Sequence, residues 1–187
     1  MNLPNFLTLL RVILIPVLVL AWFIPSPHAG QIAAAIFVIA ALTDWLDGWL
    51  ARRWDQESAF GAFLDPVADK LMVAAALVLL VDAFDSVLIT LSAIVIIGRE
   101  IVVSALREWM SEIGQRGHVA VSWLGKVKTA TQMLAITVCL ALPVTESLMH
   151  PGLWILVIAA MLTLWSMGTY LNAAWPHLRP SSEKNAE

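Results

Sequence analysis

Long apolar segments alternate with short polar joints along the whole chain of 187 residues. Each segment is close to the roughly 20 residues that an α-helix needs to cross the hydrocarbon core of a bilayer. Turn-forming residues fall at the joints, as in Pro25-Ser26-Pro27, and Pro151-Gly152 opens the last segment. The pattern predicts an all-α integral membrane protein with six transmembrane helices in one bundle. The expected spans are residues 5–24, 31–52, 61–81, 87–108, 121–142 and 152–174.

The composition agrees with this assignment, because 60% of the residues are hydrophobic and only 13% are charged. A soluble domain carries roughly 25% charged residues. Six helices in one bundle leave no residues for a second domain, so we expect one membrane domain over residues 1–176 and a polar cytoplasmic tail over residues 177–187. The first apolar run lacks a basic segment before it and a small-residue cleavage site after it. We therefore interpret it as a retained span rather than a signal peptide.

The basic residues lie on alternate joints of this predicted topology. If the N-terminus is cytoplasmic, all eleven Lys and Arg residues fall in the cytoplasmic half of the bilayer or beyond it on that side. The charged residues of the opposite joints are the acidic Asp82, Asp85 and Glu146. The positive-inside rule therefore predicts that the N-terminus and the C-terminus are both cytoplasmic.

Four aspartates lie between residues 44 and 69 on two otherwise apolar stretches. At helical pitch, Asp44 and Asp47 share one face of the second segment, and Asp65 and Asp69 share one face of the third. Unpaired carboxylates in a membrane are costly, so the arrangement predicts a strongly positive partner between the two faces. Oxygen ligands without nearby His or Cys favour Mg²⁺ or Mn²⁺ over zinc. A pair of such ions suits displacement at phosphorus.

Small and basic residues accompany these aspartates. Gly48 and Ala51 lie on the same face of the second segment, and Gly61 lies on the facing segment, so a ligand could approach the backbone there. Arg52 carries a guanidinium group that suits phosphate oxygens. Close packing between helices is an equally good explanation for the two glycines taken alone.

Two structural explanations compete with metal binding. Asp65 precedes Pro66, which is a favourable first residue of a helix, so this carboxylate could cap a helix that begins there. Ion pairs with Arg52, Arg53 or Lys70 could also neutralise single carboxylates. Capping does not explain the aspartates in the middle of the second segment, and we favour the metal hypothesis for the set as a whole.

A second polar set follows the aspartates along the chain. Arg99, Glu100 and Arg107 lie in the fourth segment, and Lys126 and Lys128 lie at the start of the fifth. Intramembrane charges are functional candidates by default. Several cations near an acidic metal site predict a pocket for a second, anionic substrate. The alternative is anchoring in the inner leaflet, with Lys and Arg side chains reaching the lipid head groups.

The spacing from Asp44 to Asp69 resembles the motif D-x2-D-G-x2-A-R-x8-G-x3-D-x3-D of the CDP-alcohol phosphotransferase family, and every motif position matches. This resemblance implies a six-helix membrane enzyme, usually a homodimer, with a catalytic mouth on the cytoplasmic side. It also implies that two metal ions bridge the pyrophosphate of CDP-diacylglycerol and that Asp69 acts as general base. The implied metal ligands are Asp44, Asp47, Asp65 and Asp69. The implied CDP-diacylglycerol-binding residues are Asp44, Gly48, Ala51, Arg52 and Gly61.

Other segments resemble bacterial family members that use sn-glycerol 3-phosphate as acceptor, among them residues 2–11, 60–70, 99–108 and 125–129. This resemblance implies that the acceptor hydroxyl attacks the β-phosphorus, releases CMP and leaves phosphatidylglycerol phosphate among the membrane lipids. It places the enzyme in the bacterial cytoplasmic (inner) membrane, with no nucleic-acid partner. Inositol phosphate or serine remains an alternative acceptor, although an uncharged acceptor would not need the cations. The implied glycerol 3-phosphate-binding residues are Arg99, Arg107, Lys126, Lys128 and Thr129.

Two other classes of membrane protein also carry acidic residues in their helices. Prenyltransferases bind isoprenoid pyrophosphate through Mg²⁺, but they usually have two acidic motifs on distant helices and more spans. A cation or proton transporter would need polar residues that continue towards the outer side. Residues 31–42 and 71–81 contain no charged residue, so we expect the site to be closed on that side.

Overall fold

The computed structural model of the chain describes residues 3–54, 59–114, 123–144 and 147–178, and all regular secondary structure in these ranges is helical. Six long helices occur, in agreement with the six predicted segments. The elements are α1 (Leu3–Trp22), α2 (Ala29–Trp54), α3 (Ala59–Phe84), α4 (Val87–Glu112), α5 (Trp123–Ala141), the short 3₁₀ helix η2 (Ser147–Met149) and α6 (Pro151–Leu178).

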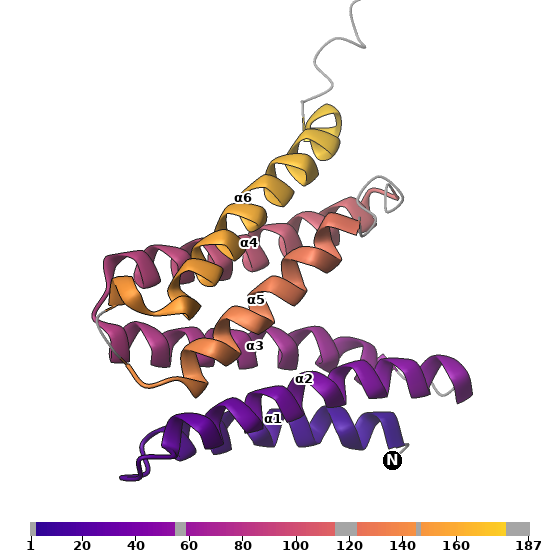
Figure 1. Cartoon of the computed structure of the whole chain (residues 1–187). Helices are drawn as coiled ribbons and strands as arrows, with labels where there is room; N and C mark the ends of the chain where they lie inside the picture. Colours follow the sequence, from indigo (N-terminus) through magenta and orange to yellow (C-terminus); the bar gives the residue numbers. More distant parts are fainter. Residues whose placement is uncertain (1–2, 55–58, 115–122, 145–146, 179–187) are drawn as a thin grey trace, which may run out of the picture.

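Packing interfaces form both between helices that are neighbours in the chain and between helices that are not (Figure 1). α1 packs against α2 and α3, α5 packs against α6 and α2, and α4 packs against α6 and α3. The start of α1, the end of α2, the end of α4 and the start of α5 all lie on the same side of the bundle. The helices therefore run back and forth, as a protein that crosses a bilayer repeatedly would require.

Several helices continue beyond the apolar segments that predicted them. α4 extends to Glu112 and α6 extends to Leu178, whereas their expected spans end at residues 108 and 174. The expected limits followed hydrophobicity, while the observed limits follow the backbone hydrogen bonds of the helix. Polar turns can therefore prolong a helix past the hydrocarbon region.

The surface of the bundle is that of a membrane protein. Large apolar side chains are exposed along several helices, such as Leu20, Val78, Ile94 and Met161. α4 and α6 each contain a stretch that is long and apolar enough to span a membrane. Five of the six helices have at least 20 residues, which corresponds to about 30 Å or more. Shorter apolar stretches within the described residues are Phe6–Trp22 of α1, Ala29–Asp44 of α2 and Val127–Ala141 of α5.

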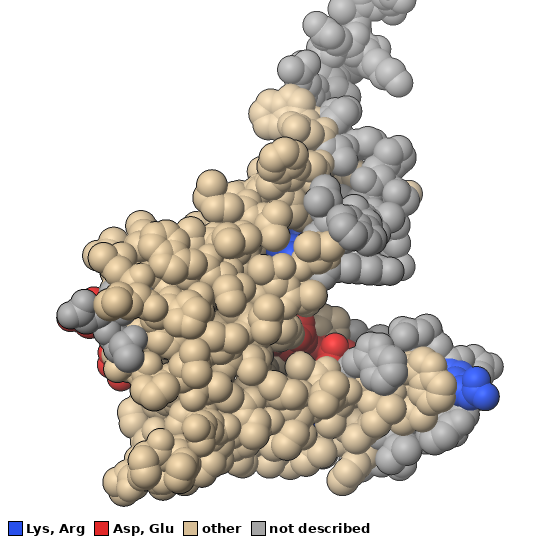
Figure 2. Space-filling view, viewed as in Figure 1, with Lys and Arg blue, Asp and Glu red and all other residues tan. Residues whose placement is uncertain are grey.

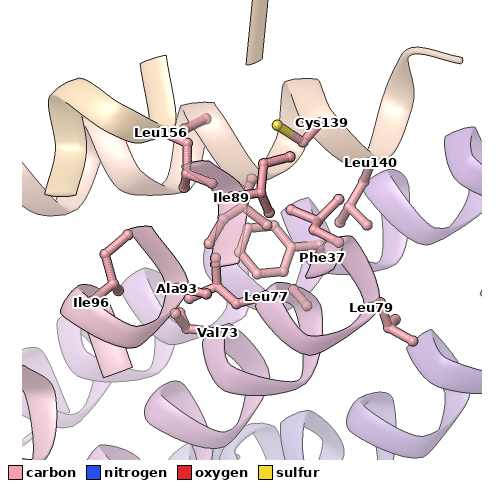
Figure 3. Close-up of a cluster of buried hydrophobic side chains, with 14 of the residues drawn as sticks. Phe37, Val73, Leu77, Leu79, Ile89, Ala93, Ile96, Cys139, Leu140 and Leu156 are labelled. Carbon is pink, nitrogen blue, oxygen red and sulfur yellow. The ribbon is translucent and has the colours of Figure 1, made fainter. Parts of the chain in front are cut away.

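A continuous apolar core fills the bundle on the far side of the aspartates. Phe37 of α2 packs near Leu77 of α3 and Ile89 of α4, and Leu140 of α5 lies beside them (Figure 3). Each of these four side chains is at most 1% exposed. The polar pathway that a transporter would need is therefore replaced here by close-packed apolar side chains.

Gly30 is required where α2 passes the end of α5. A Cβ atom at this position would collide with the carbonyl oxygen of Leu140, which cannot rotate away because it belongs to the backbone. We expect Gly30→Ala to destabilise the protein by about 1–3 kcal/mol, the usual cost of overpacking. The apparent melting temperature of the purified protein in detergent measures this effect.

Gly168→Ala in α6 is the matched control, because nothing lies within 4 Å of a Cβ atom built there. Alanine is a better helix former than glycine by about 1 kcal/mol, so this variant should melt at the same or a higher temperature. Equal melting temperatures for Gly30→Ala and the wild type would contradict the proposed close approach.

Candidate active site

An arginine from α1 lies between the two aspartates of α2. The Arg11 Nη1 atom is 2.8 Å from Asp44 Oδ1, and the Nη2 atom donates a hydrogen bond to Asp47 Oδ2. Arg11 is 1% exposed and Asp47 is 3% exposed, whereas Asp44 is only partly buried. The guanidinium group offsets the repulsion between the two carboxylates and pairs with the buried charge of Asp47, which would be costly without a partner.

Thr8 lies one turn before Arg11 and connects the aspartates of α2 with those of α3. Its hydroxyl donates a hydrogen bond to Asp65 Oδ1 and lies 3.5 Å from Asp47 Oδ2. Asp44 is also close enough to Asp65 and Asp69 for the carboxylates to repel each other. The structure therefore brings the four sequence-predicted aspartates into one acidic cluster, which we define as Asp44, Asp47, Asp65 and Asp69.

The explanation of Asp65 as a helix cap is wrong. α3 begins at Ala59 and continues through Pro66, so Asp65 lies in the second turn of an unbroken helix. A capping carboxylate would have to lie at the start of the helix, where backbone N–H groups are unpaired. Asp65 instead lies on the same face of α3 as Asp69, which is one turn further along the helix.

The cations considered as ion-pair partners from the sequence form no ion pair with the aspartates, as far as the structure describes them. The Arg53 side chain is exposed, and its guanidinium group lies over the Trp49 ring at 5.4 Å from the centroid. The Lys70 ammonium donates a hydrogen bond to Ser104 Oγ of α4. The Arg52 side chain lies outside the described residues. Arg53 is thus a surface charge.

The acidic cluster offers oxygen donors but not a preformed metal site. Among the described residues, no group of three or more His, Cys, Asp or Glu side chains has the arrangement of metal ligands. Arg11 lies between two of the carboxylates instead. The donors still fit Mg²⁺ or Mn²⁺ chemically, because four carboxylates belong to one cluster and two of them already bind a cation. An ion that bound both Asp44 and Asp47 would have to compete with Arg11.

Asp69 also lies in the wall of a second site. A cavity of about 210 Å³ is enclosed by residues of α3, α4, α5 and α6, and its lining contains both Asp69 and a set of cations. Figure 2 shows acidic atoms at the bottom of a hollow between α2 and the helices drawn above it. The cations and hydroxyl predicted from the sequence that line this cavity are Arg99, Arg107, Lys128 and Thr129.

Glu100 holds two of these cations together. Its Oε1 atom accepts hydrogen bonds from Arg99 Nη1 at 2.9 Å and from Lys128 Nζ at 2.5 Å. Arg99 also donates a hydrogen bond to Ser166 Oγ of α6 at 3.1 Å. Arg99 and Lys128 are only 7% and 3% exposed. Anchoring to lipid head groups is therefore the wrong explanation for these two side chains, because such anchors reach the surface.

Tyr170 of α6 supports both arginines of α4. Arg107 Nη2 donates a hydrogen bond to the Tyr170 hydroxyl at 2.9 Å. The guanidinium groups of Arg107 and Arg99 lie 5.2 and 5.5 Å from the centroid of the tyrosine ring, within the range of cation–π attraction. Sequence analysis missed this residue. The available signal was the i,i+4 spacing of Ser166 and Tyr170 on one face of an otherwise apolar segment.

Sequence analysis also missed the roles of Thr8 and Arg11. Arg11 served as evidence for the orientation of the chain, and both residues belong to the segment 2–11 that resembles the family, but no role at the aspartates was predicted for either. The i,i+3 spacing of Thr8 and Arg11 places both side chains on one helix face, and this pattern could have marked them as partners of the aspartates.

Four of the sequence-predicted site residues have side chains outside the described residues. They are Gly48, Ala51 and Arg52 of α2 and Lys126 of α5. Gly61 is buried near the start of α3, and the backbone of α2 carries residues 48, 51 and 52 in the turns that follow Asp47. The pocket for cytidine diphosphate at this end of α2 therefore stays a prediction.

The fold and the site define a helical membrane protein with an acidic cluster beside a basic cavity. The family model of the CDP-alcohol phosphatidyltransferases matches residues 1–170. An enzyme named CDP-diacylglycerol–glycerol-3-phosphate 3-phosphatidyltransferase from Yersinia pestis (strain Pestoides F) is 56% identical over 95% of this chain and 97% of its own. Proteins of the same name from Pectobacterium atrosepticum and Sodalis glossinidius are 58% and 57% identical, over 92% and 93% of this chain and 94% and 95% of their own. The chain belongs to the CDP-alcohol phosphatidyltransferase family.

Proposed function

We propose that this chain transfers the phosphatidyl group of CDP-diacylglycerol to sn-glycerol 3-phosphate, which gives phosphatidylglycerol phosphate and CMP. The observation that carries this proposal is the position of Asp69, which belongs to the acidic cluster and also to the wall of the cation-lined cavity. One carboxylate therefore lies between two sites of opposite charge. The names of the relatives specify the same two substrates for those proteins.

The acceptor binds in the cavity, where Arg99, Arg107 and Lys128 compensate the charge of its phosphate. The contacts of these side chains with Glu100 and Tyr170 keep the cations in fixed positions before the substrate arrives. Such preorganisation lowers the entropic cost of binding. We assign Lys126 and Thr129 to the same site, the former from the family resemblance and the latter because it lines the cavity.

The donor binds on the other side of Asp69. Asp44, Asp47, Asp65 and Asp69 would hold two divalent ions, Mg²⁺ or Mn²⁺, which when bound supply positive charge to the pyrophosphate and to the departing phosphate of CMP. Asp44, Gly48, Ala51, Arg52 and Gly61 form the pocket for the cytidine diphosphate group.

Asp69 accepts the proton of the attacking hydroxyl group as a general base. The hydroxyl oxygen forms a bond to the β-phosphorus, and the bond between this phosphorus and the oxygen that bridges to the α-phosphate breaks. CMP leaves with the electron pair of the broken bond. Asp69 is suited to this role because it lines the cavity that receives the acceptor.

All six helices span the bacterial cytoplasmic (inner) membrane in this proposal, and the active site faces the cytoplasm. The distribution of Lys and Arg over alternate joints supports this orientation. Residues 1–176 form the membrane domain, and residues 177–187 form a cytoplasmic tail. The family resemblance supports a homodimer.

An acceptor screen tests the proposed function. Purified protein with CDP-diacylglycerol and Mg²⁺ should release CMP much faster with glycerol 3-phosphate than with serine, inositol or inositol phosphate, because the cavity is small and has more cations than carboxylates in its wall. Release of radiolabelled CMP measures each rate, and chromatography of the lipid product identifies the new head group. Faster turnover with serine or inositol phosphate would reassign the acceptor and leave the transfer chemistry in place.

A further inference from the structure

A buried glutamine in the acceptor cavity has an unused hydrogen-bonding group. Gln132 of α5 is 3% exposed and lies in the cavity wall together with Asp69. Its buried Oε1 atom has no hydrogen-bond partner among the described residues. Buried side-chain oxygens in folded proteins are nearly always paired, so an unpaired one in the wall of a binding cavity points to a partner on the ligand.

Several charged groups and a hydroxyl of this wall have partners within the protein, although the buried Nε atom of Arg99 has none among the described residues. Glu100 binds Arg99 and Lys128, and Arg107 donates to the hydroxyl of Tyr170. Gln132 lies one turn after Lys128 on α5, about 6 Å further along the helix axis. A ligand whose phosphate contacts the cations can therefore extend along the same wall to the amide group.

We propose that Gln132 accepts a hydrogen bond from the hydroxyl group of the acceptor that does not react. This inference rests on the proposed function. Glycerol 3-phosphate has three polar parts, namely a phosphate, a reacting hydroxyl on C1 and a second hydroxyl on C2. The cavity offers three matching features, namely the cations, the carboxylate of Asp69 and the amide of Gln132. Gln132 is thus a specificity-determining residue. It selects acceptors that carry a second hydroxyl group on the carbon next to the one that bears the reacting hydroxyl.

The test compares two acceptors on the same enzyme preparation. 3-Hydroxypropyl phosphate keeps the phosphate and the reacting hydroxyl of glycerol 3-phosphate but lacks the C2 hydroxyl. The wild type should have a kcat/KM for CMP release that is about ten-fold higher or more with glycerol 3-phosphate, since a site built to bind a hydroxyl discriminates against the analogue without it. Gln132→Met keeps the length of the side chain but lacks the amide. In this variant the ratio of kcat/KM for glycerol 3-phosphate to kcat/KM for 3-hydroxypropyl phosphate should fall to about two-fold or less.

Thr137→Val is the control on the same helix. The Thr137 hydroxyl donates to the Met133 carbonyl oxygen within α5, and Thr137 does not line the cavity. This variant should keep the wild-type preference. The ratio of the two acceptors is independent of how much enzyme is folded, so a partly unstable Gln132→Met preparation still gives a valid answer.

Three outcomes are decisive. A preference that survives in Gln132→Met would overturn the inference. A wild type that uses both acceptors equally well would overturn it too, even if no active variant can be prepared. In either case glycerol 3-phosphate would still be a substrate and the proposed function would stand. A wild type that releases no CMP with glycerol 3-phosphate but does so with another acceptor would refute the proposed function itself.

Discussion

Asp69→Asn is expected to lower kcat for CMP release by about 10²- to 10⁴-fold or more. Asparagine has nearly the same shape as aspartate but cannot accept the proton of the attacking hydroxyl, and general bases contribute this much to rates. The substitution also removes a carboxylate from the acidic cluster, which adds to the loss. CMP release at saturating acceptor and donor measures the effect, and the melting temperature shows whether the variant is folded.

Asp82→Asn is the matched control for this prediction. Asp82 lies on the same helix, is exposed, and is 13 residues or about 20 Å beyond Asp69. The same chemical change at this distance should leave kcat within about two-fold of the wild type. An Asp69→Asn variant that keeps more than a tenth of the wild-type kcat would exclude Asp69 as the general base.

The position of Asp82 also bears on the prenyltransferase alternative. Asp82 and Asp85 are exposed at the far end of α3 and beyond it, and the apolar core lies between them and the acidic cluster. A second acidic motif at that end could not act on the same pyrophosphate. The sequence predicted this separation correctly, because 13 helical residues fix the distance whatever the packing of the bundle.

The helices and the grouping of the aspartates were predictable because both depend on local spacing. Runs of about 20 apolar residues define the helices, and i,i+3 and i,i+4 spacings place the carboxylates on one face of α2 and one face of α3. That the two faces meet was also foreseeable, because a short joint connects the two helices. Neither conclusion needs knowledge of the other four helices.

The contributions of α1 and α6 could not be predicted with the same rules. Arg11 reaches the aspartates only because α1 packs against α2 and α3, and Tyr170 reaches the arginines only because α6 packs against α4. In both cases the contact joins helices that local spacing cannot orient relative to each other. Packing preferences within a membrane bundle depend on small differences in side-chain fit, which a single sequence does not reveal.

Removal of divalent ions is expected to abolish turnover, and addition of Mg²⁺ or Mn²⁺ to restore it. When all four aspartates are ionised, the guanidinium group of Arg11 leaves the cluster with three uncompensated negative charges. Divalent ions should therefore bind without substrate and stabilise the folded protein, by about 2.7 kcal/mol at a concentration one hundred times the dissociation constant. Activity in excess chelator measures the first effect, and the melting temperature with and without Mg²⁺ measures the second.

Two variants separate ion binding at the cluster from general effects of salt. Asp47→Asn should lose the Mg²⁺-dependent rise in melting temperature, while Asp82→Asn should keep it, with sodium chloride of equal ionic strength as the reference. Undiminished turnover in excess chelator would refute the requirement for metal ions. A metal-dependent rate without any shift in melting temperature would mean that the ions enter only with the pyrophosphate of the substrate, so that Arg11 rather than a bound metal balances the aspartates between turnovers.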